Sequence, residues 1–146
     1  MMIALASDHG GFSLKETVRE YLVAKGLEFK DYGVYDDGAA DYPLVVRKPC
    51  EDISSGRADR GIFFCGTGIG VCIAANKYKG IRAACVSEVY SARLAREHND
   101  ANVLCLGGRI LSEDHALKIL DIFLETEFSK ECRHTRRIKE ISEAES

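Results

Sequence analysis

Short, continuous apolar runs alternate with longer amphipathic stretches along the chain. Runs of this length predict strands, and their continuity is typical of a parallel sheet that is covered on both faces. The run at residues 27–32 is less continuous than the others, which indicates a strand at the edge of the sheet. The expected strands are residues 2–6, 27–32, 61–65, 82–86 and 102–106.

The stretches between these runs carry helix signals, namely apolar residues at helical spacing, capping residues at the start and glycine at the end. The first expected helix ends at Gly26 and has Leu14, Val18, Tyr21 and Leu22 on one apolar face. The other expected helices run from Pro43 to about Ser55, from Val71 to Lys77, from a cap at Ser87 to about His98, from a cap at Ser112 to about Thr126, and from about Arg133 to Glu143.

Strands that alternate with helices pair in parallel through right-handed crossovers. The pattern therefore predicts the α/β class, with a single doubly wound, five-stranded parallel sheet of the Rossmann or flavodoxin-like type and helices on both faces. We expect the flavodoxin-like strand order. We also expect one domain over residues 1–146, because no repeat, low-complexity tract or linker interrupts the pattern.

Composition narrows the class of protein. The 146 residues are 46% hydrophobic and 29% charged, which suffices for one buried core. The net charge of −3 argues against a nucleic-acid binder that relies on phosphate neutralisation. No apolar run approaches the ~20 residues of a membrane span, and no signal peptide is visible. Four of the six cysteines lie in apolar segments, as free cysteines do, so we expect a cytoplasmic enzyme without a membrane partner.

Polar residues follow three of the expected strands. Asp8 and His9 follow the first strand, a glycine-rich loop begins at Cys65 at the end of the third, and Arg109 follows the fifth. The carboxyl ends of parallel strands share one edge of the sheet, and ligands bind at that edge in this fold class. We therefore expect these residues to converge.

The loop Cys65-Gly66-Thr67-Gly68-Ile69-Gly70 lies between a strand and a helix. Glycines at alternate positions allow backbone N–H groups to point at one anion, either a phosphate or a developing oxyanion. The third glycine comes one residue too early for the dinucleotide-binding pattern G-x-G-x-x-G, and the Gly-Lys-Ser/Thr ending of a P-loop is missing. A tight turn without a ligand is the alternative interpretation.

Several side chains could transfer protons. Cys65 stands beside a helix N-terminus, which suits a base or nucleophile, and a buried structural cysteine is an equal alternative. Asp8 and His9 are either proton carriers or a helix cap and a surface histidine. His98 could act as an acid or base, or it could cap its helix.

A local basic cluster lies near the end of this acidic chain. Arg133 and Arg137 are four residues apart, so on a helix they share a face and could bind one phosphate, with Arg109 as a further candidate. The alternative is a solvated helix in which the arginines pair with Glu140 and Glu143. The histidines are scattered and no Cys-x-x-Cys pair exists, so we expect no metal site.

Taken together, these motifs resemble ribose-5-phosphate isomerase type B, and they occur in order over nearly the whole chain. The segments that carry the resemblance are residues 3–11 (IALASDHGG), 41–43 (DYP), 65–70 (CGTGIG), 73–77 (IAANK), 80–84 (GIRAA), 96–102 (REHNDAN) and 133–137 (RHTRR).

The resemblance implies an aldose–ketose isomerase that interconverts ribose 5-phosphate and ribulose 5-phosphate through an enediolate, without metal or cofactor. The implied catalytic residues are Cys65 as the base between C1 and C2, Thr67 as its assistant, His98 as the group that opens the furanose ring, and Asp8 as the partner in hydroxyl proton transfer. The implied substrate-binding groups are the backbone N–H groups from Gly66 through Gly68 to Gly70 for the enediolate oxygen, His9, Arg109, Arg133 and Arg137 for the phosphate, and Tyr42 and Asn99 for the sugar.

The resemblance also implies a homodimer or a dimer-based tetramer with shared active sites. His98, Asn99 and Arg109 would then serve the Cys65 of a neighbouring subunit.

The chain departs from the family pattern at three places. Val71 stands where some members carry a glutamate base, which strengthens the assignment of Cys65. Cys72 replaces a small polar residue, and we interpret it as a packing variant. Glu131-Cys132 stands where two glycines often precede the Arg-His pair, which adds a negative charge near the expected phosphate site.

Three alternative functions stay open. The chain could isomerise a six-carbon sugar phosphate, such as allose 6-phosphate or galactose 6-phosphate. It could be a non-catalytic phosphosugar-binding protein that retains the phosphate site. A redox protein that uses Cys65 is the third, although no second cysteine stands at a resolving spacing.

Overall fold

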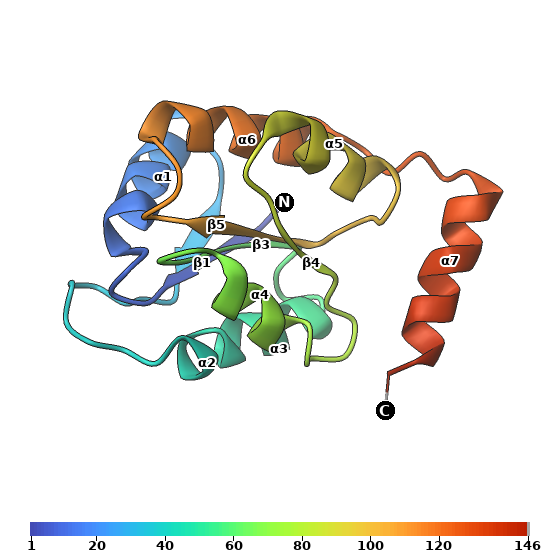
Figure 1. Ribbon diagram of the computed structural model, residues 1–146, viewed down its shortest axis with the longest axis horizontal. Helices are drawn as coiled ribbons and strands as arrows, with labels where there is room; N and C mark the ends of the chain where they lie inside the picture. The colour runs from blue at the N-terminus through green and yellow to red at the C-terminus, as the bar shows by residue number, and fades with distance from the viewer. Residues whose placement is uncertain (146) are drawn as a thin grey trace.

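The computed structural model describes residues 1–145, which form a central sheet of parallel strands between two layers of helices (Figure 1). The strands are β1 (Ile3–Ser7), β2 (Phe29–Asp31), β3 (Arg60–Cys65), β4 (Ala83–Cys85) and β5 (Val103–Gly107). The helices are α1 (Phe12–Ala24), α2 (Tyr42–Val45), α3 (Arg47–Ser54), α4 (Ile69–Ala75), α5 (Val89–Glu97), α6 (Glu113–Glu125) and α7 (Cys132–Glu143).

The strand order of the sheet is β2-β1-β3-β5-β4, so β5 lies between β3 and β4. The α/β class with helices on both faces is confirmed, whereas the expected flavodoxin-like order, which puts β4 beside β3, is wrong. The physical reason lies in the two strands. β4 has three residues and none is buried, which suits an edge, whereas β5 is buried along its whole length, which suits the interior.

Alternate residues of the central strands face opposite layers, so two apolar clusters form. One cluster packs under α1, α5 and α6, and it includes Leu5, Phe64, Leu106 and Phe123. The other packs under α2, α3 and α4, and it includes Ala6, Phe63, Cys105 and Val71. Figure 1 shows the same division of the helices above and below the sheet.

Two helix starts differ from the sequence prediction. The single helix expected from Pro43 to Ser55 is interrupted at Val46, between α2 and α3. Pro49 has no backbone N–H, so the carbonyl group of Val45 has no helical donor four residues later. The cap of α5 is Glu88 rather than Ser87, because the Glu88 carboxylate accepts the N–H groups of Tyr90 and Ser91.

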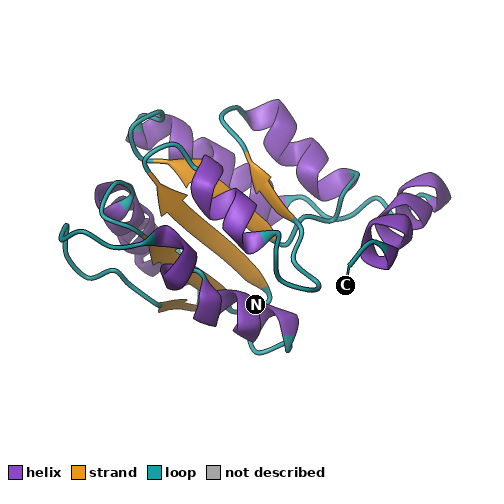
Figure 2. Cartoon of the chain, turned by 60° about the horizontal axis from the view of Figure 1, so that its bottom comes forward, coloured by secondary structure: helices purple, strands orange, loops and turns teal. Residues whose placement is uncertain are grey.

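The helix that follows the glycine loop also begins earlier than expected, at Ile69 instead of Val71. The expected cap of α6 is confirmed, since the Ser112 hydroxyl accepts the N–H group of His115 at 3.2 Å. Helix α7 stands apart from both helix layers and is joined to α6 by an extended segment (Figures 1 and 2). In residues 1–145, no helix combines the length and apolar character needed to cross a bilayer.

Asp52 on α3 ties the segment that follows β2 to the helix layer. Its carboxylate accepts the Tyr32 hydroxyl at 2.5 Å and Arg57 Nε at 2.9 Å, and Lys48 Nζ lies 3.1 Å away. The Tyr32 hydrogen bond, with Arg57 and Lys48, holds the pKa of Asp52 well below its usual range. Burial and the hydrogen bond to Asp52 raise the pKa of Tyr32 to about 12.

Replacing Asp52 should therefore have a pH-dependent effect on stability. The folded-state pKa lies below the unfolded value of about 3.9, so the ionised carboxylate stabilises the fold above that pH and the contribution disappears as the pH falls through the folded pKa. We expect Asp52→Asn to lower the unfolding free energy by about 1–3 kcal/mol at pH 7, and this difference should shrink below about pH 4. Urea unfolding between pH 7 and pH 2 measures it, with the exposed Asp37→Asn as control. A difference that is constant with pH would contradict the assignment.

Candidate active site

The three central strands end side by side, and each end carries one of the expected site residues. Asp8 follows β1, Cys65 ends β3 and Arg109 follows β5. The N–H group of Asp8 donates to the carbonyl oxygen of Phe64 at 3.2 Å, and that of Gly108 donates to the carbonyl oxygen of Cys65 at 2.9 Å. The expected convergence at the carboxyl edge of the sheet is confirmed for these three segments.

The turns at this edge pack backbone against backbone. A Cβ atom on Gly108 would stand 2.6 Å from the carbonyl oxygen of Gly10, and one on Gly66 would stand 2.9 Å from a guanidinium nitrogen of Arg109. The N–H group of Arg109 donates to the carbonyl oxygen of Gly66 at 2.9 Å. Arg109 therefore lies over the glycine loop of its own chain, and the expectation that it serves a neighbour's Cys65 is corrected by this contact.

The glycine loop holds the Cys65 sulfur. Cys65 is 4% exposed, and its Sγ atom accepts the N–H group of Gly68 at 3.2 Å. Gly68 adopts a left-handed conformation with φ of +81°, which only glycine takes without strain. The Thr67 hydroxyl accepts the N–H group of Ile69 at 3.2 Å. Two loop N–H groups are thus used inside the loop, and the Gly68 N–H points at the sulfur rather than at open space.

The first turn after β1 is organised by Asp8, whose side chain is buried. Its Oδ1 atom accepts the N–H groups of Gly10 at 2.9 Å and Gly11 at 3.1 Å. Asp8 is not the cap of α1, because Gly11 takes that position without a side-chain hydrogen bond. The Nδ1 atom of His9 accepts the N–H group of Ala40 at 3.3 Å, which leaves the ring proton of a neutral His9 on Nε2.

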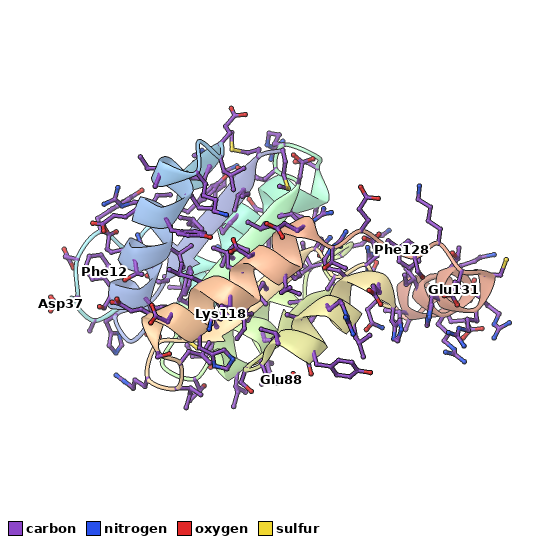
Figure 3. The ribbon with its side chains drawn as sticks, turned by 90° about the horizontal axis from the view of Figure 1, so that it is seen from above. Phe12, Asp37, Glu88, Lys118, Phe128 and Glu131 are labelled. Atoms are coloured by element: carbon purple, nitrogen blue, oxygen red, sulfur yellow. The ribbon has the colours of Figure 1, made fainter. Side chains whose placement is uncertain are left out.

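The segment that carries Ala40 also brings Tyr42 to the glycine loop. A Cβ atom on Gly70 would stand 2.7 Å from the Tyr42 ring, so the ring lies directly against the Gly70 backbone. A groove of about 590 Å³ opens beside His9, between α1 and Asp37. Phe12 and Asp37 mark this end of the molecule in Figure 3.

The remaining expected residues form a second cluster elsewhere. His98 follows α5 and stacks on His134 of α7, with ring centroids 4.2 Å apart and planes at 15°. His134 is buried, and within residues 1–145 its Nε2 atom has no hydrogen-bond partner. Burial, His98 and Arg133 lower the pKa of His134. No role was expected for His134, which directly follows Arg133 on the same helix.

Helix α7 pairs with Glu140 and Glu143, as the alternative interpretation expects, but through residues other than Arg133 and Arg137. Arg136 lies 3.8 Å from Glu140, and Lys139 lies 4.0 Å from Glu143. Arg133 is exposed, and its Nε atom contacts the Glu131 carboxylate at 3.0 Å. The negative charge expected from Glu131 near the phosphate site is therefore in direct contact with one of the proposed phosphate ligands.

These two clusters lie at opposite ends of the molecule. Figure 3 shows Glu131 and α7 at the end away from Phe12 and Asp37. The separation follows from the topology, because the segment between α5 and β5 enters the sheet at its amino edge, whereas Cys65 lies at the carboxyl edge. Asn99 lines a groove of about 620 Å³ between residues 76–84 and the end of α7, and this groove does not include Cys65.

In chemical terms, the carboxyl edge offers a thiol, a carboxylate, an imidazole and a guanidinium around bare backbone. Such a set can move protons and hold an anion. The second cluster offers two stacked imidazoles beside exposed arginines. Within residues 1–145, no three His, Cys, Asp or Glu side chains are grouped as ligands of one metal ion.

Comparison with known proteins finds sugar phosphate isomerases that match nearly the whole chain. The family model described as ribose/galactose isomerase matches residues 3–141. Ribose-5-phosphate isomerase B of Escherichia coli is 41% identical over 143 residues, which cover 98% of this chain and 95% of that protein. Galactose-6-phosphate isomerase subunit LacB of Clostridium acetobutylicum is also 41% identical, with 98% and 83% covered. The structure of ribose-5-phosphate isomerase B from Mycoplasma genitalium with bound ribulose-5-phosphate has a TM-score of 0.91 at 42% identity, with 97% and 94% covered.

The cysteines near the site differ in acidity, which predicts their order of reaction. The Cys105 thiol, hydrogen-bonded to Cys72, lowers the pKa of Cys72 to about 7, whereas burial raises the pKa of Cys85 above 9.0. Iodoacetamide reacts with thiolates, so Cys72 labelling should reach half its maximal rate near pH 7 while Cys85 labelling still rises above pH 9. Mass spectrometry of quenched samples measures both labelling rates. The Cys72→Ser variant, which should lack the label at this position, identifies the peptide that carries Cys72. Cys72 labelling that begins only above pH 9 would contradict this order.

Proposed function

Because this chain belongs to the ribose/galactose isomerase family and is an aldose–ketose isomerase of sugar phosphates, we propose that its substrate pair is ribose 5-phosphate and ribulose 5-phosphate. One observation supports the proposal most directly. The Cys65 sulfur lies at the end of β3, accepts the Gly68 N–H group, and is flanked by the turns that follow β1 and β5. A sulfur held in this way has the position that a base needs beside an oxyanion-binding loop.

The proposed reaction is a pair of proton transfers on the open-chain sugar. The Cys65 thiolate removes the proton from C2, and the electron pair of the broken C–H bond forms the C1–C2 double bond while O1 becomes an alkoxide. O1 then takes a proton and O2 loses one, with Asp8 as the carrier. The Cys65 thiol finally returns its proton to C1, which leaves the carbonyl group at C2. These steps need no metal or cofactor, so we propose a metal-free reaction with Thr67 beside the base.

The enediolate oxygen is bound in this proposal by N–H groups of the glycine loop. Of the three loop glycines, Gly68 already donates to Cys65, so the N–H groups of Gly66 and Gly70 are the proposed donors to the substrate. Gly70 lies in the first turn of α4, where N–H groups have no carbonyl partner within the helix. The Tyr42 ring against Gly70 forms one wall of the sugar site.

We further propose a homodimer, or a tetramer built from dimers, in which each site combines both clusters. His98 opens the furanose ring and lies at the edge of the sheet opposite Cys65, so one chain cannot supply both groups to one sugar. In the dimer, His9 and Arg109 of one chain bind the phosphate together with Arg133 and Arg137 of the other, and Asn99 contacts the sugar. One isomerase domain would span residues 1–146, and the cytoplasmic location stays a prediction.

A six-carbon sugar phosphate is the second candidate substrate. A galactose-6-phosphate isomerase subunit has the same sequence identity to this chain, 41%, as the ribose-5-phosphate isomerase B of Escherichia coli. The proton-transfer chemistry is the same for both sugars, so the residues around Cys65 do not distinguish them. The ratio of kcat/KM for ribose 5-phosphate, allose 6-phosphate and galactose 6-phosphate decides between the substrates. Binding of all three without turnover would favour a non-catalytic phosphosugar-binding protein.

Removing the proposed base should abolish turnover. We expect Cys65→Ala to lower kcat for ribose 5-phosphate by about 100-fold or more, the usual contribution of a positioned base, with KM much less affected. Both proteins are assayed in buffer that contains a metal chelator, and Cys50→Ala, another buried cysteine, is the control. Turnover by Cys65→Ala at the wild-type rate would exclude the assignment.

Shared active sites predict complementation between two inactive variants. Cys65→Ala and His98→Ala homodimers each lack one group in every site. A mixed dimer contains one site with both native groups, so an equal mixture should recover about a quarter of the wild-type activity after subunit exchange. A Cys65→Ala/His98→Ala double variant mixed with wild-type chains is the control. If the mixture stays inactive although mass spectrometry shows mixed dimers, the two groups do not share a site.

A further inference from the structure

Helix α1 carries a charge in its apolar face. Lys15 is fully buried, on the same side of the helix as the buried Val18 and Leu22. Its Nζ atom contacts both carboxylate oxygens of Asp31, at 2.8 Å and 2.7 Å. The rings of Phe12 and Tyr35 cover the ammonium group, with centroids 5.5 Å and 5.6 Å away.

Packing alone does not account for this charge. Taking a lysine and an aspartate out of water is costly, and apolar residues of similar volume often give equal or better stability at such a position. The neighbouring Val18 and Leu22 already attach α1 to the core. The ion pair therefore suggests a requirement for geometry rather than for stability.

Asp31 is the last residue of β2, and its hydrogen bonds hold the start of the segment that follows, residues 32–42. Its Oδ1 atom accepts the N–H group of Gly33 at 2.8 Å, and its carbonyl oxygen accepts the Tyr35 hydroxyl at 3.0 Å. Gly33 in turn is fastened to the end of β1, because its carbonyl oxygen accepts the Ser7 N–H group at 2.7 Å. The start of the segment is thus fixed to the residue that precedes Asp8.

The other end of the same segment reaches the proposed substrate site twice. Ala40 donates its N–H group to Nδ1 of His9, and Tyr42 lies against Gly70. Because Nδ1 accepts the hydrogen bond from Ala40, a neutral His9 carries its proton on Nε2. The Nε2–H group can then donate to a phosphate oxygen. Residues 32–42 therefore connect the buried ion pair to both His9 and Tyr42.

We propose that Lys15 is a positioning residue, which acts through Asp31 to hold residues 32–42 so that His9 and Tyr42 face the substrate. This inference rests on the proposed function of His9 in phosphate binding. Lys15 itself is enclosed in the protein and does not touch the substrate. Its removal affects binding of the phosphate group rather than the proton transfers at Cys65.

The test compares wild type, Lys15→Met, and Lys15→Met combined with Asp31→Leu, all as full-length chains. Methionine keeps an apolar stem of similar length and removes the charge. Lys15→Met should raise KM for ribose 5-phosphate about tenfold, the scale of one hydrogen bond to a charged group, with kcat changed by less than about twofold. The double variant should regain thermal stability, because no unpaired carboxylate stays buried, and it should keep the raised KM, because Gly33 has lost its acceptor.

Val18→Ala is the matched control, because it removes buried atoms one turn further along the same helix without touching Asp31. It should lower the melting temperature and leave KM unchanged. A raised KM in Val18→Ala, or a KM that returns to the wild-type value together with stability in the double variant, would show that Lys15 is only structural.

Inorganic phosphate is the second probe, measured by calorimetry. The Kd for phosphate should rise by the same factor as KM in both Lys15 variants, whichever sugar phosphate is the substrate. If wild type does not convert ribose 5-phosphate but phosphate affinity falls in the variants, the substrate assignment fails and the positioning role holds. Unchanged phosphate affinity in Lys15→Met overturns the positioning role.

Discussion

The geometry of the proposed active site depends on the backbone contacts between the turns at the carboxyl ends of the three central strands. A Cβ atom on Gly108 would stand 2.6 Å from the carbonyl oxygen of Gly10, and one on Gly11 would stand 2.5 Å from the backbone of Phe64. Any side chain at these positions would force the turns apart. Because the turns touch, the loop that holds the Cys65 sulfur, the Asp8 turn and the Arg109 guanidinium are fixed relative to one another.

The same topology divides the chemistry of the chain between two places. The carboxyl edge of the sheet holds the thiol, the carboxylate and the glycine loop. The stacked imidazoles of His98 and His134 lie at α7, away from that edge. A proton-transfer site of this kind gains from exclusion of water. In the proposed dimer, the partner's α7 would complete and cover the site. The helix that lies outside both helix layers of its own chain would then have a function in the other chain.

The buried Lys15–Asp31 pair lies away from the reacting atoms, and in our proposal it still sets the geometry of the substrate site. An apolar helix face would have sufficed to pack α1 on the sheet, and the ion pair adds a directional contact to that packing. Through Gly33 and Ala40 this contact reaches the imidazole of His9. The signal was visible in the sequence, since a lysine stands in the apolar stripe of α1, but a charge in a stripe does not reveal its partner.

The sequence by itself determined the α/β class, the positions of the strands, and the convergence of Asp8, Cys65 and Arg109, because periodicity and strand-end chemistry are local properties. Only the tertiary structure decided the strand order and the place of Arg109 over the glycine loop of its own chain. These features depend on which segments compete for the sheet interior. The buried β5 displaces the short, exposed β4 to the edge, and Arg109 thereby comes to lie against Gly66. Spacing along the chain carries no record of that competition.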